Sequence, residues 1–298
     1  MKSFLFALIF AVAMTIQAAG QANPDHYTIF TSDGKPATLD DIMRAAAVSD
    51  AVFLGEYHDD TVAHALQFEI FKRAVEQFGP NRKVQLSLEM FERDVQVVLD
   101  EYLAGRITED HFLRSSRPWN NYKTDYRPLV ELAKEKRLPV IAANAPRRYV
   151  NMVARLGKDS VLSLSKDAKK WLAPLPFGEP SEAYSKKFNA LMGKIHDASQ
   201  PVSPMLYSQT LWDATMAYWV AKALKEHKGS LVVHLNGGFH TESRLGTIEK
   251  LAKYRSKAKS LVVTMRYEEN FRTFDPAKHT GLGDFVILTD SKQPRSQR

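Results

Sequence analysis

The chain has 298 residues, a length that fits one large domain or two small ones. Of these residues 44% are hydrophobic and 25% are charged, which is ordinary for a globular fold. It contains no cysteine, which excludes disulfides and a cysteine-linked lipid anchor. The formal charge is +7, but Lys and Arg are spread without a dense basic block. We therefore expect no nucleic acid partner, and either a solvated cationic surface or a small anionic ligand.

The N-terminus has the layout of a secretory signal. Lys2 supplies a basic start, residues 4–14 form an apolar run, and small residues follow up to Ala22. The apolar run is shorter than the ~20 residues that a transmembrane helix needs. We expect a signal peptide at residues 1–22 and a mature chain, residues 23–298, without a transmembrane segment. A periplasmic or secreted location follows from this expectation.

Short apolar runs alternate with segments of helical spacing in the first half of the chain. Buried strands are predicted at residues 51–54, 84–88 and 139–143. The first strand is followed by apolar residues that recur every four positions up to residue 78, which predicts an amphipathic helix. Further helical segments extend to about residue 114. Asp59 or Asp60 is expected to cap the first helix, and Asp125 to cap a helix before the third strand.

The second half begins with a segment, residues 145–227, that is predicted to be almost wholly helical and is broken by two clusters of prolines. Strands return at residues 231–235, 261–265 and 285–288, with a helix at residues 242–254. The pattern predicts a single domain of the α/β class, with a parallel or mixed central sheet flanked by helices. Residues 158–227 are expected to form a helical insertion over the strand C-terminal ends. The polar tail, residues 291–298, is expected to be frayed.

Polar residues recur where the predicted strands end. In open α/β sheets the ligand crevice lies outside the carboxyl ends of the strands, so these residues are expected to meet in one site. Two of the turns share a Gly-x-x-His pattern, at residues 55–58 and 237–240, and glycine allows the sharp turn from strand to helix. The residues at the strand ends are Glu56, His58, Glu89, Asn144, Arg147 and His240.

These residue types support two chemistries. His58, His240 and Glu89 are typical ligands of a catalytic divalent metal with an open position for water. Without a metal, Glu56, His58, Glu89 and His240 provide a general base with an orienting carboxylate. No P-loop, His-Glu-x-x-His helix or Gly-x-Ser-x-Gly elbow is present, so the common hydrolase and nucleotide-binding signatures do not apply.

Several other polar and aromatic residues have two interpretations. Arg147 either binds an anionic group or pairs with a carboxylate, and His234 is either a core histidine in an apolar strand or a ligand. Gln209 and Asp213 stand one helical turn apart and predict a buried polar pair. His64 lies on a helix among charges and carries little functional signal. Six aromatic residues are expected to be packing residues: Trp119, Tyr122, Tyr126, Trp212, Tyr218 and Trp219.

With these residues in order, the chain resembles the ChaN-like haem-binding family, part of a wider group with the Tiki proteases and the erythromycin esterases. The resemblance lies in the order and spacing of short stretches across residues 51–265. The stretches are residues 54–59 (LGEYHD), 88–91 (LEMF), 126–129 (YRPL), 143–147 (ANAPR) and 236–240 (NGGFH).

The resemblance implies a periplasmic or outer-membrane-associated protein that binds haem for iron uptake. It also implies haem held between the protomers of a homodimer, with a tyrosine on the iron and a histidine nearby. The candidate tyrosines are Tyr57, Tyr184 and Tyr207. In the related hydrolases the matching His and Glu positions are catalytic. The alternatives to haem binding are therefore a hydrolase, with or without a divalent metal, and a binding scaffold with a vestigial site.

Overall fold

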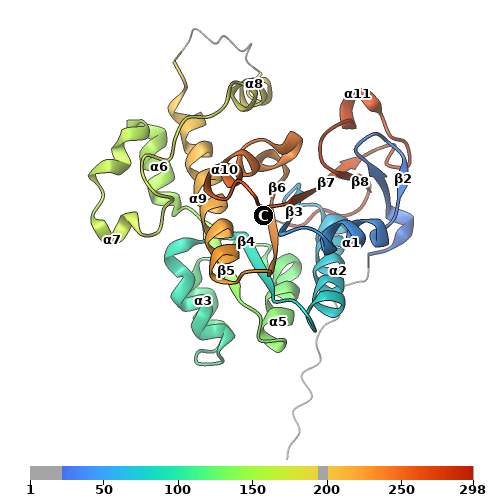
Figure 1. The fold of residues 1–298 in the computed structure, drawn as a ribbon, viewed down its shortest axis with the longest axis horizontal. Coiled ribbons are helices and arrows are strands. Elements are labelled where there is room, and N and C mark those ends of the chain that lie inside the picture. Colours follow the sequence, from blue (N-terminus) through green and yellow to red (C-terminus); the bar gives the residue numbers. More distant parts are fainter. Residues whose placement is uncertain (1–21, 194–200, 298) are drawn as a thin grey trace, which may run out of the picture.

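The computed structural model describes residues 22–193 and 201–297, so the predicted signal peptide lies outside the described residues apart from Ala22. An eight-stranded sheet with the order β2-β1-β8-β7-β3-β6-β4-β5 forms the centre of the described chain (Figure 1). The strands from β8 to β5 run parallel, and β1 pairs antiparallel with β2 and β8. The predicted mixed sheet is confirmed. The strands are β1 (Tyr27–Thr31), β2 (Pro36–Ala37), β3 (Ala51–Glu56), β4 (Val84–Glu92), β5 (Val140–Asn144), β6 (Leu231–Gly237), β7 (Ser260–Glu268) and β8 (Phe285–Asp290).

Helices cover both faces of the sheet, which explains why the central strands are apolar at almost every position (Figure 1). Side chains alternate between the faces, so Val52 and Leu54 of β3 enter one core and Phe53 enters the other. The first core contains residues of α1 (Leu39–Ala47), α2 (Thr61–Phe78), α3 (Gln96–Leu103), α4 (Glu109–Ser116) and α5 (Arg127–Glu135). The second contains residues of α9 (Pro204–Glu226) and α10 (Thr247–Tyr254).

The segment predicted to be almost wholly helical contains α6 (Arg147–Leu156), α7 (Lys166–Lys169), α8 (Glu182–Leu191) and α9. Between α7 and α8, residues 171–181 form no helix, so the break predicted at the first proline cluster is confirmed. Three prolines fall within it, and a proline lacks the backbone N–H that continues a helix and disfavours helical geometry in the residue before it. α9 packs on β5, β6, α6 and α10, and its N-terminal half reaches the carboxyl edge of the sheet.

Local signals at the helix ends were partly correct. Asp60 caps α2, because its Oδ1 accepts hydrogen bonds from the backbone N–H of Val62 (3.1 Å) and Ala63 (3.2 Å). Asp125 does not cap α5, which begins after Tyr126 without a side-chain cap. It lies in the preceding π-helical turn η3 (Tyr122–Tyr126), where its carboxylate is engaged elsewhere. The helix predicted from residue 242 begins only at α10, because Gly246 takes a φ of +56° immediately before it.

The C-terminal tail packs against the fold instead of fraying, as far as Ser296. The Ser296 N–H donates to the carbonyl of Asp59 at 3.0 Å, and the Arg295 guanidinium lies 3.6 Å from the centre of the Tyr267 ring. The prediction from polarity was therefore wrong, because backbone and cation–π contacts hold polar residues as well as apolar ones. Within the part of the chain that the structure describes, no helix has the length and apolar character to cross a membrane.

Candidate functional site

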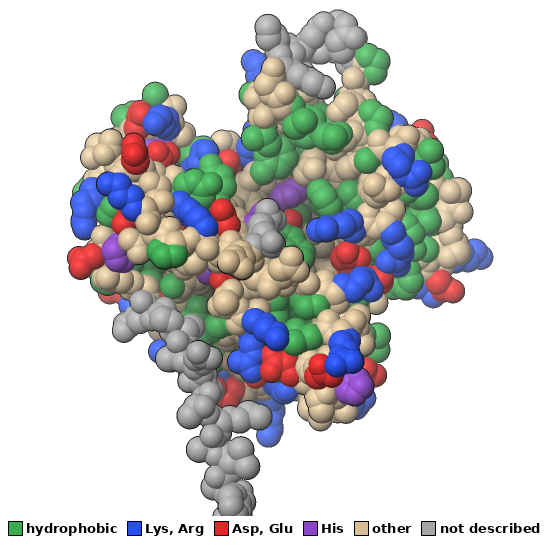
Figure 2. Space-filling model, turned by 180° about the vertical axis from the view of Figure 1, so that it is seen from behind, with side chains coloured by type: hydrophobic (Ala, Val, Ile, Leu, Met, Phe, Trp, Pro, Cys, Tyr) green, Lys and Arg blue, Asp and Glu red, His purple; other side chains and the backbone are tan. Residues whose placement is uncertain are grey.

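The carboxyl ends of β3, β6, β4 and β5, which are neighbours in the sheet, border a cavity of about 380 Å³. On the face shown in Figure 2, a histidine and an acidic side chain are visible in a hollow between hydrophobic side chains. The cavity lining includes five of the residues predicted from the strand ends: His58, Glu89, Asn144, Arg147 and His240. These five side chains therefore meet at one cavity, as predicted from the strand ends, and Glu56 lies directly beneath it.

Glu56 ends β3, and its side chain is fully buried under His58. Its carboxylate accepts hydrogen bonds from Gln67 Nε2 (2.6 Å), Tyr126 Oη (2.6 Å) and His58 Nδ1 (2.8 Å). Because Nδ1 donates to this carboxylate, Nε2 of His58 is left to accept a proton or bind a metal. Glu56 is therefore an orienting group beneath the cavity and not part of its wall.

His64, from α2, supplies a buried positive charge below this pair. Its Nε2 lies 3.2 Å from Glu56 Oε2, and its Nδ1 lies 3.2 Å from Asp125 Oδ2. Burial disfavours the imidazolium, but the Glu56 and Asp125 carboxylates raise the pKa of His64 to about 10. Burial likewise opposes ionisation of Glu56, and the positive charge of His64 with the His58 bond holds its pKa well below the usual range.

From sequence, no functional role was predicted for His64, although its position contains a signal for one. His64 and Gln67 stand three residues apart on α2 and both are buried, at 3% and 0% exposure. Polar residues on the apolar face of a helix need partners, since an unpaired buried polar group is costly. A pair of them directly after the Gly-x-x-His turn indicates a network under that turn.

His240 has its own orienting carboxylate. Its Nδ1 lies 2.8 Å from Oδ1 of Asp213, a fully buried residue of α9, and the Thr247 hydroxyl donates to the same oxygen at 2.8 Å. Its Nε2 lies 3.8 Å from Glu89 Oε1. Burial lowers the pKa of His240, but the Asp213 and Glu89 carboxylates outweigh it and raise the pKa above its usual value. The predicted Gln209–Asp213 pair does not form, because Gln209 lines the cavity and Asp213 bonds His240.

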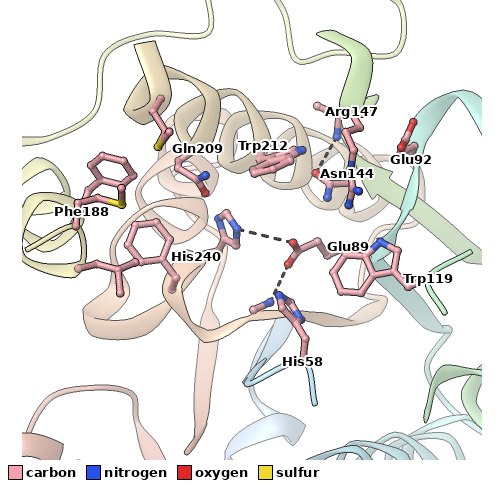
Figure 3. A pocket seen from close by; sticks show the side chains of 16 residues that line it. His58, Glu89, Glu92, Trp119, Asn144, Arg147, Phe188, Gln209, Trp212 and His240 are labelled. Carbon is pink, nitrogen blue, oxygen red and sulfur yellow. Dashed lines mark hydrogen bonds and ion pairs between the residues drawn. The ribbon is translucent and has the colours of Figure 1, made fainter. Parts of the chain in front are cut away.

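Glu89 and Gly237 join the two histidines. The pairing of β4 with β5 shifts register between Leu88 and Glu92, so Glu89 lies where the regular ladder is interrupted. Its Oε2 accepts from the backbone N–H of Gly237 at 2.7 Å. A Cβ on Gly237 would lie 2.7 Å from Nε2 of His58, so only glycine leaves room for this imidazole. Figure 3 shows Glu89 between His58 and His240.

Asn144 and Arg147 form the wall at the β5 side. Asn144 is 6% exposed, and its Oδ1 accepts from the Ala145 N–H at 2.9 Å. Arg147 is exposed and opens α6. Within residues 22–193 and 201–297, Arg147 makes neither an ion pair nor a hydrogen bond through its side chain, so of its two interpretations the carboxylate pairing does not occur there.

The remaining predicted ligand residues lie away from the cavity. His234 is fully buried in β6, its Nδ1 is 2.8 Å from Ser87 Oγ, and burial lowers its pKa to about 3, as expected for a neutral core histidine. Tyr57 accepts a hydrogen bond from Arg266 at 2.7 Å and packs on the ring of Tyr267.

The other two candidate tyrosines are engaged in similar ways. Tyr184 is 1% exposed, and its ring centre lies 5.2 Å from that of Phe239. Tyr207 donates to Glu179 Oε2 at 2.6 Å. Among the described residues, no tyrosine lines the cavity.

Apolar side chains from the insertion and from two neighbouring loops complete the cavity wall. The rings of Trp119 and His58 lie nearly perpendicular at 4.8 Å between centres, and those of Trp212 and His240 do so at 6.2 Å (Figure 3). Both tryptophans were expected to be packing residues, and both face the cavity. The rim adds three exposed apolar residues, Leu191 (68% exposed), Met192 (43%) and Met205 (50%). Sequence spacing did not indicate them, because apolar residues on a helix usually point to a core.

Two carboxylate-bound imidazoles facing one cavity can bind a metal centre that a ligand brings, or exchange protons with it. A site for a free divalent metal is a separate matter. Within the described chain, no group of three or more His, Asp and Glu side chains is arranged to hold a metal ion. The divalent-metal alternative therefore has no support from the side-chain geometry.

The fold and the cavity define an α/β protein with a ligand cleft at the carboxyl ends of its parallel strands. The family model described as haem-binding uptake, Tiki superfamily, ChaN matches residues 42–251, more than two thirds of the chain. The protein belongs to this family, which confirms the resemblance inferred from the sequence. No curated protein matches it significantly in sequence.

Solved structures share the fold at low identity. ChaN of Campylobacter jejuni, described with cofacial haem binding, is 17% identical with a TM-score of 0.64 over 90% of this chain and 98% of that one. A structural-genomics protein from Bacillus cereus is 13% identical with a TM-score of 0.50, over 92% and 97%. An erythromycin esterase mutant in its open conformation is 12% identical with a TM-score of 0.48, over 89% of this chain and 83% of that one. At these identities the likeness concerns the fold alone.

Proposed function

We propose that this protein binds haem in the cavity between His58 and His240 and serves haem or iron uptake outside the cytoplasm. One observation carries the proposal: two carboxylate-oriented imidazoles lie at the floor of a cavity whose rim includes exposed apolar residues. Large apolar side chains left in water, such as Leu191, mark a binding surface. Membership of the haem-binding uptake family supports the same ligand.

The residues present fit a haem. An imidazole Nε2 is a standard haem-iron ligand, and its hold is improved when Nδ1 bonds a carboxylate, as in both His58 and His240. Either histidine would hold the iron, and the bound iron would supply a centre that coordinates the imidazole nitrogen. Gly237 keeps the floor open, since a Cβ there would press on His58 Nε2 at 2.7 Å. Trp119, Trp212 and the apolar rim would cover the porphyrin.

If haem binds in this cavity, the tyrosine ligand that the resemblance implies must come from a second copy of the chain. Tyr57, Tyr184 and Tyr207 lie outside the cavity lining. A tyrosine on the iron would then come from the partner in the homodimer that the resemblance implies, across the exposed rim of Leu191 and Met192. Sedimentation with and without hemin tests this: a shift from monomer to dimer on loading supports it, and a monomer in both states contradicts it.

The test of haem binding is a hemin titration of the purified protein. We expect a saturable Soret shift, and we expect His58→Ala and His240→Ala to change its position or its midpoint. His111→Ala is the matched control, since His111 is exposed on α4, away from the cavity. Binding no stronger than that of an unrelated protein would refute the proposal.

Export is part of the proposal and rests on the basic start and apolar run before Ala22. N-terminal sequencing of the protein recovered from a periplasmic fraction should begin near residue 23. An intact N-terminus in the cytoplasmic fraction would contradict it.

A second candidate function is ester or peptide hydrolysis, favoured by the same carboxylate–imidazole pairs. His58 Nε2 would accept a proton from water as the hydroxide adds to the carbonyl carbon. His240, whose pKa is raised, would give a proton to the leaving alkoxide or amine. Turnover of 4-nitrophenyl acetate should then be abolished in His58→Ala with little change in melting temperature. A variant that unfolds would show that His58 is structural, and a wild-type rate equal to that of buffer would remove the candidate.

A further inference from the structure

A second cavity, of about 590 Å³, adjoins the first at the β5 side. Glu92, Trp119 and Arg147 line both, so the two cavities are adjacent with Arg147 at the junction, and we call them together the cleft. The second cavity is otherwise bordered by residues such as Met90 and Arg117. The cleft is therefore longer than the histidine floor, and its two ends can be compared.

The charges around the second cavity leave one cation in excess. Arg117 bonds both carboxylates there, Glu92 at 3.1 Å and Asp94 at 2.7 Å, and Arg148 bonds Asp94 at 2.6 Å. Two guanidinium groups thus neutralise two carboxylates. Arg147, the third guanidinium, has no partner within the described part of the chain, and it faces the cleft. A cation without a counterion beside a cavity attracts an anionic group of a ligand.

Two further donors point the same way. Asn144 lines the cavity and is only 6% exposed. Its Oδ1 accepts a hydrogen bond from the Ala145 N–H, and its Nδ2 has no hydrogen-bond partner among the described residues. α6 begins at Arg147 without a side-chain cap. The first N–H groups of a helix carry partial positive charge and commonly receive anions.

The opposite end of the cleft is apolar. Phe188 and Leu191 of α8, with Met192, Met205 and Phe239, line the first cavity away from Arg147. Figure 3 shows Phe188 and Arg147 on opposite sides of the histidine pair. A ligand that fits both ends is amphiphilic, with an apolar body and its negative charge at one edge.

We propose that Arg147, the amide of Asn144 and the start of α6 form a carboxylate subsite that sets the orientation of the bound ligand. The inference rests on the proposed function and deepens it. For haem, the two propionates lie toward Arg147 and the second cavity, and the vinyl and methyl edge lies against Phe188 and Met192. Arg is suited to this task because its planar guanidinium bonds a carboxylate through two N–H groups.

The test compares hemin with hemin dimethyl ester, in which both propionates are esterified, by Soret titration under one cosolvent condition. The wild-type protein should bind hemin about fivefold more tightly, a ratio within the usual range for partly exposed charge pairs. Arg147→Gln should lose about this factor for hemin and leave the diester midpoint unchanged. Arg155→Gln is the matched control, because Arg155 is exposed on the same helix and bonds Asn151 outside the cleft.

The outcomes separate the two proposals. Equal midpoints for hemin and its diester in the wild-type protein, or the same small effect of Arg147→Gln and Arg155→Gln on hemin, would overturn the carboxylate subsite and leave haem binding intact. Saturable binding of neither porphyrin would overturn haem binding and the subsite together. A loss in Arg147→Gln that is equal for both porphyrins would show that Arg147 acts on the shape of the cleft and would also overturn the subsite.

Discussion

Replacing His64 with glutamine tests the buried charge network most directly. The substitution removes the imidazolium that faces Glu56 Oε2 and Asp125 Oδ2, both at 3.2 Å. Glutamine keeps a polar side chain in the site but brings no charge. Two carboxylates would then remain in a region where their side chains are at most 4% exposed, without the cation that compensates them.

The loss of folding free energy in His64→Gln can be estimated in two ways. Breaking a buried ion pair by removing one partner costs about 3–5 kcal/mol. The rise of the His64 pKa from 6.5 to about 10 corresponds to ~5 kcal/mol in favour of the protonated form. Gln67 and Tyr126, which donate to Glu56 at 2.6 Å, are unchanged by the substitution, so we expect the lower end, about 3 kcal/mol. For a chain of this size that is a fall in melting temperature of roughly 5–10 °C.

The network also predicts a pH dependence. The folded pKa of His64 is about 10, above the unfolded value of about 6.5, so between these values the folded chain keeps a proton that the unfolded chain releases. The stabilisation is complete below pH 6.5 and is lost as the pH rises toward 10, at ~1.4 kcal/mol per pH unit. His64→Gln lacks this contribution, so its deficit relative to the wild type should shrink as the pH is raised.

Urea unfolding at several pH values between 6.5 and 10 measures both effects. His111→Gln is the control, because the same substitution at an exposed position of α4 should change the free energy of unfolding by less than ~0.5 kcal/mol. A His64→Gln variant whose free energy of unfolding is within 1 kcal/mol of the wild type near neutral pH, or whose deficit does not depend on pH, would contradict a charged His64 in this network.

Two further predictions concern the floor of the cavity. Gly237→Ala should weaken hemin binding by about tenfold or more, because the added Cβ would lie 2.7 Å from His58 Nε2. An unchanged midpoint in the hemin titration would show that the imidazole can move without an energetic cost. Asp213→Asn should lower the pKa of His240, measured from the NMR titration of its ring protons, because it removes the carboxylate at 2.8 Å; a titration that stays in place would argue against this pairing.

Much of the fold and the position of the cleft could be predicted from sequence. The apolar run of β3, the cap at Asp60 and the alternation of strands with helices are local patterns that depend on neighbouring residues. The gathering of Glu89, Asn144 and His240 also follows from sequence, because the carboxyl ends of parallel strands meet at one edge of a sheet. No local pattern predicted the antiparallel strand β1 or the packing of the C-terminal tail.

The partner of each residue was decided by the tertiary structure. Asp213 is 27 positions from His240 and bonds it only because α9 packs on β6. Asp125 has the sequence context of a helix cap, but the π-helical turn directs its carboxylate to Asn121 and His64. Trp119 and Trp212 were expected to be core or lid packing residues, and the path of their segments places both in the cavity wall. Each of these outcomes depends on a contact between distant segments.

The two Gly-x-x-His turns show the division clearly. From the order of residues we could predict that each turn follows a buried strand and that both lie at the same edge of the sheet. The carboxylate that bonds each imidazole, Glu56 for His58 and Asp213 for His240, became known only from the packing of the elements. The physical reason is that periodicity reports which face of an element is buried. It does not report which element covers that face, and the pKa and free proton site of a buried histidine depend on that neighbour.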